Sequence, residues 1–201
     1  KLNTLKICSL IGRSDIKVYP GAEKPLKYDL VTAEHVHGKS GLDIDGKEIP
    51  IINNYDFQNQ HAVDFIVQTC NNYKEQIYLC PTGPLTNIAL SLQKDHSIAK
   101  NIKGIIFMGG AGMTLGNITP AAEFNIYVDP HAANIVLNSG IPLVMLGLDV
   151  THKVNVNDQI INEIQQNNNQ SSNFFADLMK FYSKFHRKLY QTDETPLHDP
   201  C

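Results

Sequence analysis

The sequence IYLCPTGPLTNIALSLQK, residues 77–94, carries a clear change from one type of secondary structure to another. Its first part, Ile77 to Cys80, is a short apolar run of the kind that forms a strand covered on both faces. The turn-forming residues Pro81-Thr82-Gly83 follow. Apolar residues then recur at helical spacing, at Leu85, Ile88, Ala89 and Leu92. The stretch therefore predicts a strand, a loop and a helix over about 84–94.

The same alternation continues on both sides of this stretch. Other apolar runs predict strands at Ile16 to Tyr19, Ile105 to Met108 and Pro142 to Leu146. Helical patterns cover about 1–11, 61–73, 130–138 and 157–190, the last interrupted by a polar surface loop at 165–173. Strands that alternate with helices imply right-handed crossovers, and so predict an α/β fold with a mostly parallel sheet and helices on both faces.

Composition narrows the classes of protein that fit. The 201 residues, 42% of them hydrophobic, suffice for one sizeable core, so a single domain over residues 1–201 is predicted. A net charge of -3 argues against binding to a nucleic-acid polymer or an anionic membrane, and favours a small-molecule substrate. The four cysteines are scattered without CxxC spacing, as expected for reduced thiols in a cytoplasmic protein.

Both ends of the sequence lack the signals of a natural boundary. The chain opens without Met, inside a predicted helix, and stops just after Asp199-Pro200. Because Asp as N-cap and Pro at the first position usually begin a helix, elements are expected to be missing on both sides.

Ligands of parallel sheets bind where the strands end. The residues at those ends are Pro81-Thr82-Gly83, Gly109-Gly110 and Leu148-Asp149. The glycines could cradle a phosphate, but a phosphate loop needs a helix that begins at the glycines, and here loop-forming residues continue to Pro120. A tight turn at the sheet edge is therefore the favoured interpretation of Gly109-Gly110.

Three polar residues in the following loop are candidates for binding a sugar. Asn117, Glu123 and Asn125 have apolar neighbours, so their amides and carboxylate need partners, which sugar hydroxyls could supply. Taken singly, each is more often an ordinary solvated loop residue. Asp129 precedes Pro130 and is interpreted as a helix cap.

Two histidine segments leave alternatives open. His198-Asp199 pairs a proton donor or acceptor with a carboxylate, although such a pair is more often structural than catalytic. His35 and His37 have a spacing that could bind a metal, but no third ligand is nearby.

Five segments taken together resemble the inosine-uridine preferring nucleoside hydrolase family. They are PTGPLTN at 81–87, MGG at 108–110, GNITPAAEFNIYVDP at 116–130, GLDVTH at 147–152 and PLHDP at 196–200. The segment AEHVHGKSGLD at 33–43 is also similar to the family. The His-Asp-Pro form resembles the branch that accepts pyrimidine or mixed nucleosides.

The resemblance implies hydrolysis of a ribonucleoside, a small-molecule substrate, with a calcium ion. Calcium would take the backbone carbonyl of Thr82 and the carboxylate of Asp199, both hard oxygen ligands. Asn117 and Glu123 would hold the ribose 5'-hydroxyl, and Asn125 the lower ribose hydroxyls. His198 would face the leaving base, with His37 close enough to help. The family also implies a homo-oligomer, a tetramer or a dimer.

One part of the family pattern does not occur in the sequence. The family carries an aspartate cluster of the type Asp-x-Asp-x-Gly-x-Asp-Asp, which supplies two further calcium carboxylates and the general base. Asp43 and Asp45 lie in the wrong place to replace it. The expectation is that this exact polypeptide is inactive while its full-length parent is active. The alternatives are a non-catalytic nucleoside or ribose-binding module and an interaction domain with a dead pocket.

Overall fold

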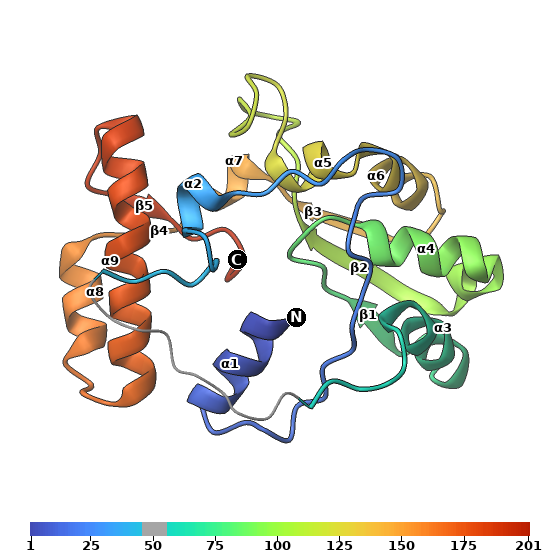
Figure 1. Cartoon of the computed structure of the whole chain (residues 1–201). Coiled ribbons are helices and arrows are strands. Elements are labelled where there is room, and N and C mark those ends of the chain that lie inside the picture. The colour runs from blue at the N-terminus through green and yellow to red at the C-terminus, as the bar shows by residue number, and fades with distance from the viewer. Residues whose placement is uncertain (46–55) are drawn as a thin grey trace. The chain divides into compact units, whose positions relative to one another are not determined.

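The computed structural model describes residues 1–45 and 56–201, which form two compact units (Figure 1). The sheet unit comprises Tyr19–Val31, Asn59–Val154 and His198–Cys201. The helical unit comprises Lys1–Val18, Thr32–Gln58 and Asn155–Leu197. The single domain predicted over 1–201 stays a prediction. Within the described residues, no helix combines the length and apolar character that crossing a membrane requires.

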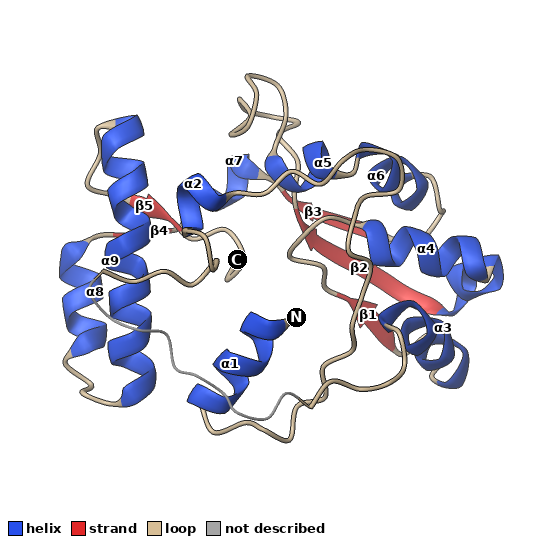
Figure 2. Ribbon diagram, in the orientation of Figure 1, coloured by secondary structure: helices blue, strands red, loops and turns tan. Residues whose placement is uncertain are grey.

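The sheet unit contains three parallel strands in the order β1-β2-β3 (Figure 2). They are β1 (Ile77–Leu79), β2 (Ile102–Met108) and β3 (Leu143–Leu146). Its helices are α3 (Ala62–Asn72), α4 (Thr86–Lys94), α5 (Phe124–Val128), α6 (Pro130–Leu137) and α7 (Leu148–Thr151), with a 3-10 helix η1 (His96–Asn101) before β2. The predicted α/β fold with a parallel sheet flanked by helices is thereby confirmed.

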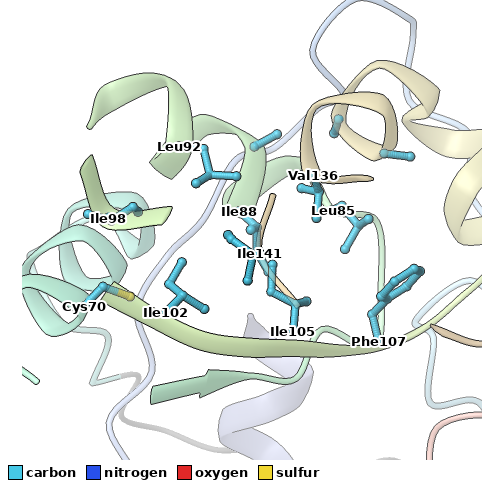
Figure 3. Close-up of a cluster of buried hydrophobic side chains, with 13 residues drawn as sticks. Cys70, Leu85, Ile88, Leu92, Ile98, Ile102, Ile105, Phe107, Val136 and Ile141 are labelled. Atoms are coloured by element: carbon cyan, nitrogen blue, oxygen red, sulfur yellow. The ribbon is translucent and has the colours of Figure 1, made fainter. Parts of the chain in front are cut away.

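The core of the sheet unit lies between the sheet and its helices (Figure 3). Ile105 and Phe107 of β2 are almost fully buried and pack in one cluster with Ile88 of α4 and Val136 of α6. Fully burying a side chain of this size contributes about 1.5–3 kcal/mol, so this cluster contributes several kcal/mol to the unit's stability. It holds the sheet in place and fixes where the strands end.

The helical unit is built around a long helical hairpin. Its helices are α1 (Leu2–Leu10), α2 (Glu34–His37), α8 (Asp158–Gln165) and α9 (Gln170–Tyr190). Ile161, Ala176 and Met179 form the core between α8 and α9. An antiparallel pair, β4 (Asn155–Val156) and β5 (Thr195–Pro196), joins the two ends of this segment. The predicted interruption of the helix occurs, but it is shorter than 165–173 because the side chain of Asn169 caps α9.

Two sequence-based predictions differ from the structure. The strand predicted at Ile16 to Tyr19 is wrong, because this segment forms only an isolated bridge, from Val18 to Phe57. The segment predicted as loop after Pro120 contains the short helix α5, which begins because Glu123 supplies a cap for its first amides.

Candidate active site at the strand ends

Backbone hydrogen bonds join the carboxyl ends of the three strands. The amide of Met108 donates to the Pro81 carbonyl over 3.1 Å, and that of Gly109 to the Leu146 carbonyl over 3.2 Å. The amide of Leu148 in turn donates to the Gly110 carbonyl over 3.0 Å. The loops that follow the strands therefore begin from one rigid edge, as expected for a binding site in a parallel sheet.

Glu123 places a buried carboxylate at this edge. Its side chain is 2% exposed, with Oε1 accepting from the Asn125 amide at 2.8 Å. Oε2 accepts from the amides of Gly110 at 2.9 Å and Ile126 at 3.1 Å. The Gly110 amide thus donates to a carboxylate of the protein itself, which agrees with a tight turn rather than a phosphate loop.

Position 110 requires glycine for two reasons, its backbone conformation and the lack of space for a Cβ. Its φ of +89° lies in the left-handed region that L side chains rarely adopt, and a Cβ there would lie 2.7 Å from the Met145 sulfur. The glycine therefore allows β2 to end in a turn that delivers its amide to Glu123.

Asn125 reaches the ends of two strands. Its side-chain nitrogen donates to the Met108 carbonyl at 3.1 Å and lies 3.5 Å from the Thr82 carbonyl. Because Asn125 also binds Glu123 through its backbone, these contacts bring together three of the predicted site residues: Thr82, Glu123 and Asn125. Sequence reasoning missed the Met108 carbonyl, since no side chain signals it.

Asn117 lies on a tightly folded loop. Its Oδ1 accepts from the Phe124 amide at 2.8 Å, and its own amide donates to the Ala122 carbonyl at 3.1 Å. Gly116 is in contact with the same turn, where an added Cβ would lie 2.2 Å from the Ala122 carbonyl oxygen. Asn117 is exposed, and its role toward a ribose hydroxyl stays a prediction.

His198 and Asp199 belong to the sheet unit as well. His198 Nδ1 lies 2.8 Å from the Thr151 hydroxyl at the end of α7, and the His152 ring centroid is 5.8 Å from the His198 ring. Burial raises the pKa of Asp199, and the negative charge of Glu123 raises it further. Burial also lowers the pKa of His152. Sequence reasoning missed Thr151, although it follows the third strand end, one of those singled out from the sequence.

His37 belongs to the helical unit. Its ring stacks on Tyr182 at a centroid distance of 5.4 Å, while His35 contacts the edge of Phe185 at 5.6 Å. Burial lowers the pKa of His37, and the nearby His35 lowers it further. The predicted cooperation of His37 with His198 stays a prediction. Over residues 1–45 and 56–201, no group of three or more His, Cys, Asp or Glu side chains could hold a metal ion.

Asp129 is confirmed as a helix cap. Its Oδ1 accepts from the Ala132 amide at 3.0 Å, while Oδ2 accepts from the Leu26 amide at 2.9 Å and the Thr86 hydroxyl at 2.7 Å. The residue is 0% exposed. Asp129 therefore joins α4 and α6 beneath the candidate site, a structural role that agrees with its interpretation from the sequence.

Known proteins match nearly the whole chain. The family model described as inosine-uridine preferring nucleoside hydrolase matches residues 2–201. A pyrimidine-specific ribonucleoside hydrolase of Photobacterium profundum is 45% identical over 202 residues, 99% of this chain and 63% of that protein. One of the same description from Shewanella oneidensis is 46% identical over 202 residues, 99% of this chain and 62% of that protein.

Solved structures are also similar to this chain, and they cover nearly all of it, as the relatives do. A plant nucleoside hydrolase has a TM-score of 0.92 and 33% identity, covering 98% of this chain and 62% of that one. A purine-preferring ribonucleoside hydrolase from Gardnerella vaginalis has a TM-score of 0.91 and 34% identity, covering 98% of this chain and 63% of that one. The chain thus spans less than two thirds of the length of the relatives it matches.

Proposed function

Because this chain belongs to the inosine-uridine preferring nucleoside hydrolase family, we propose that the protein hydrolyses the N-glycosidic bond of ribonucleosides to ribose and free base. One observation carries the proposal beyond family membership. Asn125 bonds to Glu123 through its backbone while its side chain reaches the Met108 and Thr82 carbonyls. This places an amide, a carboxylate and a backbone carbonyl at one edge of the sheet, and such groups suit a polyhydroxylated sugar.

The proposed roles follow the charge that develops in the reaction. Cleavage passes through an oxocarbenium-like sugar, so groups that bind more strongly as positive charge builds on the ring lower the barrier. The carboxylates of Glu123 and Asp199 supply negative charge, and Asn117 with Glu123 would hold the 5'-hydroxyl. Asn125 would contact the lower ribose hydroxyls and keep the anomeric carbon in position.

His198 is proposed to act on the leaving base. As the bond between the anomeric carbon and the base nitrogen breaks, its electron pair passes to the base. A proton delivered from His198 would neutralise that base, and His37 is proposed to assist. This role agrees with the position of His198 beside Asp199 in the sequence and beside Thr151 in the sheet unit.

Calcium is the proposed cofactor. The Thr82 carbonyl and the Asp199 carboxylate are hard oxygen donors. Burial and then the negative charge of Glu123 raise the pKa of Asp199, and a bound cation would oppose both effects. These two residues fit part of a calcium site. When bound, calcium supplies Lewis acidity toward the attacking water.

The substrates are proposed from the names of the relatives, and the cellular compartment from the state of the cysteines. Relatives from Photobacterium profundum and Shewanella oneidensis are named pyrimidine-specific, so uridine and cytidine are the proposed first substrates. Among the described residues, none of Cys8, Cys70, Cys80 and Cys201 forms a disulfide, which supports a reducing, cytoplasmic setting. The homo-oligomer, a tetramer or a dimer, remains part of the proposal.

The proposal is tested on the full-length parent of this chain, by following the release of uracil and ribose from uridine. Activity is expected to fall on dialysis against a calcium chelator and to return with added calcium. Asn125→Ala is expected to lower kcat/KM by about 100-fold or more, since it removes a group that positions the sugar. Asn138→Ala, which changes an exposed amide at the end of α6, is the matched control.

The non-catalytic alternative gives a different result in the same experiment. A nucleoside or ribose-binding module would bind uridine saturably in calorimetry and release no uracil at any calcium concentration. An unchanged rate in Asn125→Ala would show that the proposed sugar site is wrong even if the protein is a hydrolase.

A further inference from the structure

Thr151 places a buried hydroxyl group beside His198, the histidine that is proposed to act on the leaving base. It is the last residue of α7 and is 0% exposed. Its Oγ1 lies 2.8 Å from Nδ1 of His198, a residue 47 positions away along the chain. The contact is therefore made by the fold and not by neighbours in sequence.

The backbone around Thr151 is held to the sheet. Its amide donates to the Gly147 carbonyl over 3.0 Å, and the Leu148 amide at the start of α7 donates to the Gly110 carbonyl over 3.0 Å. A β-branched side chain also has few χ1 rotamers, so the hydroxyl direction is fixed with the backbone. His198, by contrast, is only partly buried. Thr151 is thus the fixed partner of the pair.

We infer that Thr151 is a positioning residue for His198: its hydroxyl holds Nδ1 so that the Nε2 edge of the ring is the one presented to the leaving base. The inference rests on the proposed function. It adds to the site a residue that would not itself touch the substrate.

The chemistry of a hydroxyl suits this task because it both donates and accepts. The Thr151 hydroxyl can bond to Nδ1 by donating to it or by accepting from it. The ring can therefore keep its Nε2 edge in one direction, which keeps that edge aligned with the leaving base.

Two substitutions separate this role from simple packing. Thr151→Val keeps the shape and removes the hydroxyl, whereas Thr151→Ser keeps the hydroxyl and removes a buried methyl group. A packing role predicts that Ser is the more harmful change, and a positioning role predicts that Val is. Thr195→Val is the matched control, because Thr195 is also 0% exposed and its hydroxyl donates to Ser183 Oγ at 3.0 Å.

The kinetic test compares two substrates of the whole protein. Thr151→Val is expected to lower kcat for uridine about 10- to 100-fold with KM within about twofold, the range of a misaligned proton donor. Its kcat for 4-nitrophenyl riboside, whose leaving group departs without a proton, is expected to stay within about twofold of wild type. Thr151→Ser and Thr195→Val are expected to keep wild-type kcat on both substrates.

A spectroscopic readout tests the inference apart from activity. Nitrogen-15 NMR of labelled histidine is expected to show a hydrogen-bonded Nδ1 of His198 in wild type and Thr151→Ser, and to lose that hydrogen-bond signature in Thr151→Val. The same spectrum in all three proteins, or equal kcat for uridine in wild type and Thr151→Val, overturns the inference. Absence of uracil release by wild type overturns the proposed function instead, while the spectra still decide whether Thr151 orients His198.

Discussion

Glu123→Gln is the substitution that most directly tests how the site is built. The carboxylate accepts three backbone hydrogen bonds, from Gly110, Asn125 and Ile126, at 2.9, 2.8 and 3.1 Å. An amide in its place has one oxygen, which keeps the two donors at Oε2 and turns an NH₂ group toward the Asn125 amide. Losing one bond to a charged acceptor costs about 1.5–3 kcal/mol. The two remaining bonds become neutral and about half as strong, which adds about 1 kcal/mol.

The expected loss in the free energy of unfolding is therefore about 2.5–4 kcal/mol, summed from those contributions. Urea unfolding followed by circular dichroism measures the total, and amide hydrogen exchange at Asn125 locates it. The matched control is Glu163→Gln, on the exposed side of α8, where the carboxylate accepts from the Gln159 side chain and from no other described residue. That change is expected to cost at most about 0.5 kcal/mol.

Equal urea midpoints for Glu123→Gln and Glu163→Gln would refute the reasoning. So would unchanged exchange at Asn125, because the bond at Oε1 would then contribute nothing. A loss of stability with exchange raised only in the helical unit would also contradict it, since all three donors belong to the sheet unit.

Three other substitutions test separate features. Asp129→Ala leaves three donors around a fully buried position, so a loss of about 3–5 kcal/mol is expected in urea unfolding, against about 1 kcal/mol for the exposed cap variant Asn157→Ala. Gly116→Ala places a Cβ 2.2 Å from backbone and is expected to cost about 1–3 kcal/mol by the same measurement. The pKa of His37 is lowered from 6.5, first by burial and then by His35. As the pH falls from 6.5 toward the lowered pKa, the unfolded chain therefore binds more protons at this position than the folded chain. The stability that is present above pH 6.5 is lost as the pH falls through the lowered pKa. His37→Gln is expected to flatten this decline, measured as urea midpoints at several pH values.

The fold could be predicted from the sequence where local patterns and packing agree. Ile77 to Cys80 and Ile105 to Met108 are apolar runs next to helical patterns, and both form strands of the sheet. Ile16 to Tyr19 has the same local character but forms only one bridge, from Val18. A short apolar run becomes a strand only when a neighbouring strand is available for its backbone, and the sequence does not carry that information.

The candidate site could be predicted in its residue types but not in its bonds. Glu123 and Asn125 were chosen as polar groups that need partners, and they do lie together at the strand ends. Their partners, however, are mostly backbone groups such as the Gly110 amide and the Met108 carbonyl. Every residue has such groups, so no pattern of side chains reveals which of them the fold will bring to the site.

The glycines after β2 could present backbone amides either to an anionic ligand or to a carboxylate of the protein itself. A run such as Gly109-Gly110 after a strand suggests backbone amides that bind an anion, and in this protein the amide of Gly110 does bind one. The anion is the protein's own Glu123, brought there by a loop that ends at α5. A carboxylate that is 2% exposed needs such donors, because burying a polar group without hydrogen-bond partners costs free energy. In this protein the fold, and not the glycine motif, therefore decides that the bound anion is a side chain and not a ligand.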